Sequence, residues 1–439
     1  MEKKHSIDEL IDHIEDVELT TVHGRITEIV GTLMRAIVPQ VKMGEICLVK
    51  RDGAPLIAEV VGFTQGEVFL SPVGEMKGIG PSSEVIPLRM PLHIKVGNGL
   101  LGRVLNGVGE PLDSREKGPL KDVPVTFPVV NSPPNPLHRQ LISEPISTGV
   151  RCIDGILPCA KGQRMGIFAG PGVGKSTLLG MIARNSQADI NVISLIGERG
   201  REVREFLEND LGEEGMARSV VIASTSDEAP QLRINAAYVA TAIAEYFREQ
   251  GKTVVLMMDS VTRFARALRE IGLAAGEPPA RAGYTPSVFA TLPKLLERSG
   301  NGETGSITAF YAILVAGSDM KEPVADEVMS ILDGHIVLSQ EYAHKGHYPA
   351  IDPLPSLTRV LSTIASKEQI ALITQVREVL ANYAKNELLI RIGEYKPGSD
   401  KDADFAIKFI DKVCRFLQQR VDEAVTLEET LQQLNVLFR

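Results

Sequence analysis

One nine-residue stretch constrains the fold of this 439-residue chain more than any other. Residues 169–177 read Ala-Gly-Pro-Gly-Val-Gly-Lys-Ser-Thr and fit the phosphate-binding pattern Gly-x-x-x-x-Gly-Lys-Ser/Thr, with Ala169 in place of the first glycine. The short run Arg-Met-Gly-Ile-Phe at residues 164–168 before it is typical of a buried strand, and residues 178–184 after it are typical of a helix. A strand, a glycine-rich loop and a helix in this order form the phosphate site of a parallel α/β sheet.

The chemistry of this loop predicts a bound nucleoside triphosphate. Its glycines let successive backbone N–H groups point inward as an anion nest, and the helix that follows adds the positive end of its dipole. We expect Lys175 to reach the β- and γ-phosphates and the Ser176 hydroxyl to be a magnesium ligand. The predicted nucleotide-binding residues of the loop are Gly170, Pro171, Gly172, Val173, Gly174, Lys175, Ser176 and Thr177.

The composition is that of a soluble globular protein, with 44% hydrophobic residues. No apolar run approaches the roughly 18 residues that span a bilayer, and the charged start of the chain lacks the apolar segment of a signal peptide. Four scattered cysteines fit neither a disulfide framework nor a zinc site, so we expect a reduced, cytoplasmic setting. The net charge of −9 and the absence of Trp argue against nucleic acid as a partner.

The N-terminal part of the chain changes character at about residue 22. Residues 6–14 have a capping-box start and a helical apolar stripe; the stripe fits equally a helix that packs on its own domain and one that docks on a partner. Residues 22–90 are short β-rich runs separated by glycines, which predicts a small barrel or sandwich. Because residues 1–90 carry more acidic than basic side chains, we favour a role in assembly over oligonucleotide binding.

Strands and helices alternate after a proline-rich connector, and this predicts a parallel sheet covered by helices on both faces. Ligands of such sheets bind at the carboxyl ends of the strands. The predicted strands, beside the one before the loop, are 189–196, 219–223, 253–258 and 307–315. After about residue 365 the strand signals stop, and helices are predicted at 367–386, 402–419 and 427–437.

Two acidic residues follow predicted strands. Asp259 is expected in the magnesium shell, although Asp after a strand also often caps the next helix. Glu198 comes one helix and one strand after the loop, where a carboxylate can orient the water that attacks a γ-phosphate. Arg199 would then face the phosphates. The alternative is a surface ion-pair patch within residues 198–202.

Longer segments resemble a known family. Residues 169–177, 197–203, 258–266 and 348–354 look like the catalytic subunit family of the rotary ATP synthases. Residues 267–286 resemble the ATPases of type III secretion systems and their flagellar export relatives, and so does the run 292–298. Two departures from the rotary synthases favour this secretion branch: Gly200 replaces a Thr, and residues 391–402 lack the acidic stalk-contacting loop.

The resemblance, which covers about residues 20–439, implies an α/β fold assembled as a homohexamer: a RecA-like P-loop domain flanked by an N-terminal β-barrel and a C-terminal helical domain. It implies Glu198 as the water-activating carboxylate and Tyr348 as the aromatic that stacks on adenine, and it leaves open whether Phe416 shares that pocket. Arg359 matches an arginine finger delivered from the neighbouring subunit, but a structural salt bridge explains it equally well. The implied domains are an N-terminal amphipathic segment (1–20), the barrel (21–90), the ATPase domain (91–364) and the helical domain (365–439).

The implied activity is magnesium-dependent ATP hydrolysis that energises type III protein export, releasing chaperones and unfolding export substrates. Implied partners are a stator-like regulator at the N-terminal segment, a central stalk coiled coil, chaperones and substrates, with membrane contact only peripheral, through the secretion apparatus. The loop 272–286 resembles one that faces the central pore of the ring.

Three other functions remain as alternatives to an export ATPase: the catalytic subunit of a rotary F/V-type ATPase, an RNA-dependent helicase and a nucleotide-gated structural ring. The motifs do not distinguish an injectisome from a flagellar system, because both share them.

Overall fold

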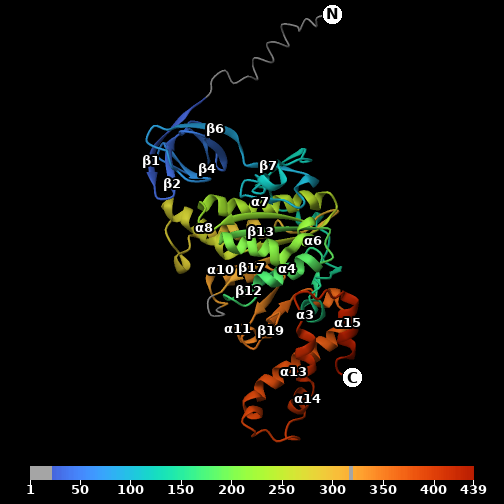
Figure 1. The fold of residues 1–439 in the computed structure, drawn as a ribbon. Helices are drawn as coiled ribbons and strands as arrows, with labels where there is room; N and C mark the ends of the chain where they lie inside the picture. Colours follow the sequence, from blue (N-terminus) through green and yellow to red (C-terminus); the bar gives the residue numbers. More distant parts are fainter. Residues whose placement is uncertain (1–21, 316–319) are drawn as a thin grey trace, which may run out of the picture. The chain divides into compact units, whose positions relative to one another are not determined.

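A computed structural model describes residues 22–315 and 320–439 (Figure 1). The chain divides into two compact units, one ending at Leu92 and one beginning at His93. The predicted amphipathic helix at residues 6–14 lies outside the described residues.

The first unit is a closed antiparallel barrel of six strands in the order β1-β2-β5-β4-β3-β6. Apolar side chains such as Ile26, Met34 and Leu70 alternate inward and fill it. The prediction of a small barrel is confirmed, although β2 and β6 were not predicted. The strands are β1 Gly24–Val30, β2 Leu33–Ile37, β3 Glu45–Val49, β4 Leu56–Thr64, β5 Glu67–Pro72 and β6 Glu84–Pro91.

The second unit is built on a sheet with the order β19-β18-β12-β17-β15-β13-β14-β8, and β16 pairs with β17. The strands from β18 to β8 are parallel, as predicted, whereas the unpredicted β19 runs antiparallel to β18 at the edge. The strands are β8 Val104–Leu105, β12 Arg164–Ala169, β13 Ile190–Glu198, β14 Ser219–Thr225, β15 Thr253–Asp259, β16 Gly300–Asn301, β17 Ser306–Leu314, β18 Gly334–Leu338 and β19 Ile351–Thr358. Two small sheets pair β7 His93–Val96 with β9 Val125–Pro128 and β10 Pro145–Ile146 with β11 Cys159–Ala160.

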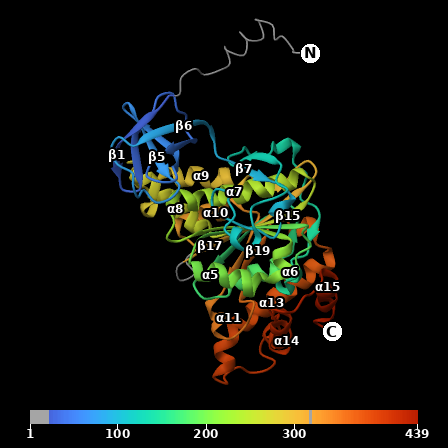
Figure 2. The ribbon, with the colours of Figure 1, turned by 45° about the horizontal axis from the view of Figure 1, so that its top comes forward.

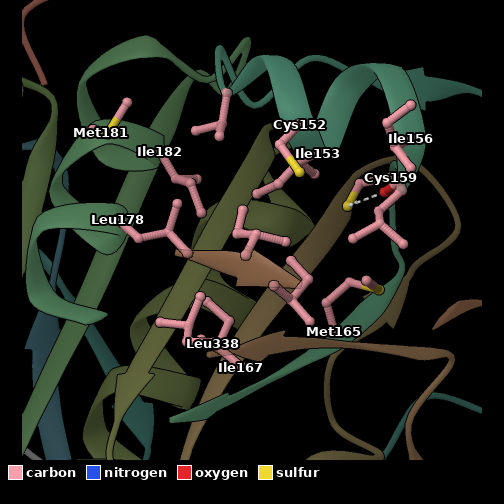
Figure 3. Close-up of a cluster of buried hydrophobic side chains, with 14 of the residues drawn as sticks. Cys152, Ile153, Ile156, Cys159, Met165, Ile167, Leu178, Met181, Ile182 and Leu338 are labelled. Carbon is pink, nitrogen blue, oxygen red and sulfur yellow. Dashed lines mark hydrogen bonds between the residues drawn. The ribbon is translucent and has the colours of Figure 1, made fainter. Parts of the chain in front are cut away.

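Helices cover both faces of this sheet. On one face α7 packs against β13, where the Ser194 hydroxyl donates to the carbonyl of Ala236 in α7. On the other face α4 packs its apolar side chains against Met165 and Ile167 of β12, together with α3 (Figure 3). The helices of this α/β part of the second unit are α3 Arg151–Ile156, α4 Lys175–Asn185, α5 Gly200–Glu205, the π-helix η3 Phe206–Leu211, α6 Gly212–Ala217, α7 Pro230–Glu249, α8 Val261–Ala274, α9 Pro286–Leu296, α10 Pro323–Ile331 and α11 Gln340–His344.

Three helices end the chain: α13 Lys367–Arg391, α14 Lys401–Leu417 and α15 Leu427–Val436. The predicted helices are confirmed, and α13 runs five residues further than predicted. In Figure 2, α13 and α14 lie together at the end of the ribbon that carries the C-terminus. Side chains of all three helices join the cluster that α3 and α4 form, so they belong to the same compact unit as the sheet.

One buried ion pair holds α7 against the segment after α9. Glu245 is 0% exposed and Arg298 is 1% exposed. Their side chains form two hydrogen bonds, of 2.8 Å (Nε to Oε1) and 2.6 Å (Nη2 to Oε2), and Arg298 Nη1 also donates to the carbonyl of Val129 at 3.0 Å. Since a buried carboxylate is tolerated only when it is paired, each partner depends on the other.

We predict that Arg298→Met lowers the stability of the second unit by about 3–5 kcal/mol, because it leaves Glu245 buried and unpaired. The double variant Arg298→Met with Glu245→Leu should lose clearly less, since it removes both charges. Denaturant unfolding followed by circular dichroism measures both. A double variant as unstable as the single one would contradict the assignment.

Candidate active site

The phosphate-binding loop connects the end of β12 to the start of α4. Gly172 and Gly174 have φ angles of 74° and 84°, in the left-handed region that favours glycine. A side chain at Gly172 would meet no atom within 4 Å, so backbone conformation rather than crowding requires glycine there. The first turn of α4 offers the free N–H groups and the dipole that bind an anion, and it begins at Lys175.

Three charged side chains predicted for the site meet at the carboxyl edge of the sheet. The Lys175 ammonium forms an ion pair with Oδ1 of Asp259 and lies 3.8 Å from Oε1 of Glu198. Asp259 ends β15 and Glu198 ends the neighbouring β13, so the parallel register brings both carboxylates together. They are only 2% and 9% exposed. The arrangement is a lysine between two buried carboxylates beside a phosphate loop.

Glu198 is held in an unusual environment. Burial, and next the negative charge of Asp259, raise the pKa of Glu198 to about 7, against the opposing effect of Lys175. Its Oε2 accepts a 3.2 Å hydrogen bond from Arg263, whereas its Oε1 is buried and has no hydrogen-bond partner. A carboxyl poised near neutral pH with a free acceptor atom is suited to take a proton from water.

Arg263 was not predicted as a site residue. It lies one helical turn after Asp259, in the first turns of α8, and its guanidinium reaches Glu198 across Gly197. Gly197 has a φ of 66°, and a Cβ there would come within 3.0 Å of Arg263 Cδ. The sequence signal was an arginine four residues after the strand-end aspartate, inside a segment quoted only for its family resemblance.

Two other predicted residues of this region make different contacts. Arg199 begins α5 with its side chain 76% exposed and pairs with Glu202 at 3.0 Å. Among the described residues it forms no hydrogen bond or ion pair with the phosphate loop, so the surface ion pair describes Arg199 but not the buried Glu198. The side chain of Thr177 forms a hydrogen bond with Asp210, and this bond ties the first turn of α4 to the π-helix η3.

Tyr348 lies beside the loop. Its ring is 43% exposed, and a Cβ placed on Gly174 would touch it at 3.4 Å. Tyr348 lines an open pocket of about 770 Å³ together with Gly346, Arg151, Arg415 and the loop residues 418–423. Phe416 is not in this pocket: it is 5% exposed and lies in the core against Gly155 of α3. Sequence reasoning missed residues 418–423, which follow α14.

Arg359 lies at the opposite end of the sheet from the phosphate loop. Thr358 pairs with Gly334 at the start of β18, while Ala169, which precedes the loop, pairs with Leu338 at its end. At about 3.3 Å per residue, the two ends of β12 are about 16 Å apart. The exposed Arg359 donates to the carbonyl of Met329 at 3.4 Å, and no carboxylate in the described part of the chain pairs with it. The salt-bridge alternative therefore has no partner among these residues.

The described residues fit a metal carried by the nucleotide rather than a free-standing metal site. They contain no group of three or more His, Cys, Asp or Glu that could hold an ion. Ser176 at the start of α4 and the buried Asp259 supply the oxygen atoms that Mg²⁺ prefers.

None of the described helices is both long and apolar enough to cross a membrane.

These features define a class: a phosphate-loop, nucleotide-binding α/β protein with paired acidic strand ends. Residues 26–89 match the beta-barrel domain of the ATP synthase alpha/beta family, and residues 149–358 match its nucleotide-binding domain. Residues 365–436 match the T3SS EscN ATPase C-terminal domain. The chain belongs to the ATP synthase alpha/beta family, in its branch of type 3 secretion and flagellar ATPases.

Relatives match over nearly the whole chain. The "Flagellum-specific ATP synthase" of Bacillus subtilis (strain 168) is 50% identical, with 98% of each chain covered. The "Type 3 secretion system ATPase" of Xanthomonas euvesicatoria is 53% identical over 94% of this chain and 93% of its own. The solved structure of the assembled ATPase EscN from the enteropathogenic E. coli type III secretion system has a TM-score of 0.90 and 45% identity, covering 95% of this chain and 100% of that chain. The family resemblance and the barrel–α/β–helical fold are thus confirmed.

We predict that the stability of the ligand-free protein depends on pH through Glu198. Its folded pKa of about 7 lies above the ordinary value for glutamate, so unfolding releases a proton between those values and stability falls as pH rises toward 7. Glu198→Gln has no proton to release, so its melting temperature should rise relative to wild type from pH 5 to pH 8. Glu205→Gln, at an exposed carboxylate of α5, is the matched control. If the melting temperatures of Glu198→Gln and wild type changed with pH in parallel, the raised pKa of Glu198 would be contradicted.

Proposed function

We propose that this chain hydrolyses ATP with Mg²⁺ and that the hydrolysis energises type III protein export. The observation that carries the proposal is the buried Oε1 of Glu198, which accepts no hydrogen bond and lies beside the Lys175 ammonium, at the edge of the sheet where the phosphate loop begins. Family membership, and relatives named as ATPases at about 50% identity, support it.

The residues of the loop would bind the phosphates. Backbone N–H groups of residues 172–177, at the loop and the start of α4, hold the β- and γ-phosphates, and Lys175 exchanges part of its pairing with Asp259 for the γ-phosphate. Ser176 and Asp259 would hold Mg²⁺, which would neutralise charge that develops on the phosphate oxygens. The exposed ring of Tyr348 stacks on adenine in the pocket beside Gly174.

In the proposed reaction Glu198 orients the attacking water and accepts its proton as the oxygen bonds to the γ-phosphorus and ADP leaves. Arg263 holds the carboxylate in position through Oε2, which leaves Oε1 free for the water. Arg199 remains a proposed phosphate-facing residue only if α5 moves when nucleotide binds, because its side chain is exposed here.

A complete site needs two copies of the chain in this proposal. Arg359 lies at the far end of the sheet from its own phosphate loop, so it can serve as an arginine finger only toward a neighbouring subunit. Such fingers contribute about 10³–10⁵ in rate. The relative solved in assembled form, and the same relative solved with its central stalk EscO at a TM-score of 0.87, favour a homohexamer with a stalk partner.

The export role is favoured over the catalytic subunit of a rotary F/V-type ATPase because residues 365–436 match a C-terminal domain named for a secretion ATPase. We propose residues 1–20 as the binding segment for a stator-like regulator, 21–90 as the assembly barrel, 91–364 as the ATPase domain and 365–439 as the helical domain. Chaperone release and substrate unfolding would take place in the cytoplasm, at the membrane only through the apparatus. Flagellar and injectisome relatives are about equally similar, so either system fits.

The test mixes two inactive variants, Glu198→Gln and Arg359→Ala. Each alone should lose at least about 10³ in ATPase rate, Arg359→Ala through the finger. A one-to-one mixture that exchanges subunits should recover up to about a quarter of wild-type activity, because about one interface in four pairs an intact Glu198 with an intact Arg359. Lys175→Ala mixed with Glu198→Gln is the matched control and should recover nothing, since both changes fall in the same half-site.

No recovery in the first mixture, with full exchange shown by mass photometry, would contradict the shared site. An Arg359→Ala variant as active as wild type would remove the finger. Together with a wild-type rate per subunit that does not change with protein concentration, it would also contradict the need for a second copy.

A further inference from the structure

A buried arginine beneath the Tyr348 pocket has no part in the proposed chemistry. Arg151, the first residue of α3, is 7% exposed. Its guanidinium forms an ion pair with Glu423 and donates 2.9 Å and 3.4 Å hydrogen bonds to the carbonyls of Gln418 and Phe416. Its backbone N–H donates to the side chain of Gln419 at 2.7 Å. One residue thus holds both ends of the segment 418–423.

The same segment is fixed to the two parts of the nucleotide site. The Gln419 backbone N–H donates to the carbonyl of Tyr348 at 3.0 Å, and its side chain donates to Gly149 at 2.8 Å. Arg184, in the last turn of α4, donates to the carbonyl of Val421 at 2.8 Å. The segment is therefore tied to the main chain of Tyr348, which carries the exposed aromatic ring, and to the helix that follows the phosphate loop.

We propose that Arg151 is a positioning residue for the nucleotide base: it holds residues 418–423 as the second wall of the pocket that faces Tyr348. This inference rests on the proposed function, because it needs a nucleotide whose phosphates lie in the loop 169–177. Arg151 lines the pocket but acts through the segment that it orders, by means of Glu423 and the main-chain carbonyls.

The energetic reason is preorganisation. The six residues 418–423, which lie in the connection between α14 and α15, would lose conformational entropy if a base had to order them on binding. Arginine suits this task because its planar fork can donate to a carboxylate and two carbonyls at once, which the point charge of lysine cannot reproduce. The phosphate loop has its own supports in β12 and α4, so Arg151 should affect binding of the base and leave binding of the phosphates nearly unchanged.

The test separates the two halves of the ligand. MgADP carries phosphates and a base, whereas inorganic triphosphate with Mg²⁺ carries phosphates alone, and both are measured as competitive inhibitors of the ATPase of the full chain. Arg151→Gln should weaken MgADP about tenfold and inorganic triphosphate less than twofold, raising the KM for ATP with little change in kcat. Arg151→Lys should be intermediate, since it restores the charge without the fork.

The matched control is Arg103→Gln, which breaks another buried arginine–carboxylate pair of the same unit, with Asp113 at 2.8 Å. It should leave the ratio of the two inhibition constants at the wild-type value. Should Arg151→Gln fail to fold, Glu423→Gln keeps the arginine and its carbonyl bonds and should move the ratio in the same direction by a smaller factor.

Equal weakening of both inhibitors by Arg151→Gln, or no weakening of either, would overturn the inference while leaving the proposed function intact. A wild-type protein that binds neither MgADP nor inorganic triphosphate would instead overturn the proposed function.

Discussion

The ion pair between Lys175 and Asp259 is the interaction on which the arrangement of the site depends. Two carboxylates lie buried at neighbouring strand ends, and such a pair is stable only if a cation lies close to both. Lys175 supplies that charge from the start of α4, so the loop that binds phosphate also holds the acidic edge together. When a γ-phosphate draws on the same ammonium, Arg263 remains as the cation that keeps Glu198 in place.

The sequence predicted the parts of this site that lie on consecutive elements. Loop, strand and helix form a local pattern, and the rule that ligands bind at the carboxyl ends of parallel strands predicts that Glu198 and Asp259 lie together. Arg263 could have been predicted by the same reasoning, because a residue four positions after the strand-end Asp259 lies one helical turn away from it and therefore at the same edge of the sheet. The exposed position of Arg199 was not predictable, since spacing alone does not tell which way a side chain points where a strand turns into a helix.

Contacts between segments far apart in the chain could not be predicted from the sequence. Residues 418–423 reach the Tyr348 pocket only because α14 ends beside α3, more than 260 residues earlier in the chain. Phe416 lies two residues before that segment but points into the core, where helix packing rather than proximity in sequence decides burial. Likewise, β19 runs antiparallel to β18 although the short helix α11 lies between them in the chain, and the end of β19 places Arg359 at the far end of the sheet.

The short helix α3 joins two parts of the second unit that sequence analysis treated as separate domains. Its buried Asp154 accepts hydrogen bonds from Ser147, Thr148 and Gly149, and these bonds fix the segment that leads into the helix. The next residue, Gly155, receives Phe416 of α14 and Thr430 of α15 so closely that a Cβ would collide with the phenyl ring. The segment that lines the base pocket lies in the connection between those same two helices. Because Arg151 at the start of α3 already holds this segment in place, the packing of α3 against α14 and α15 also supports the wall of the base pocket.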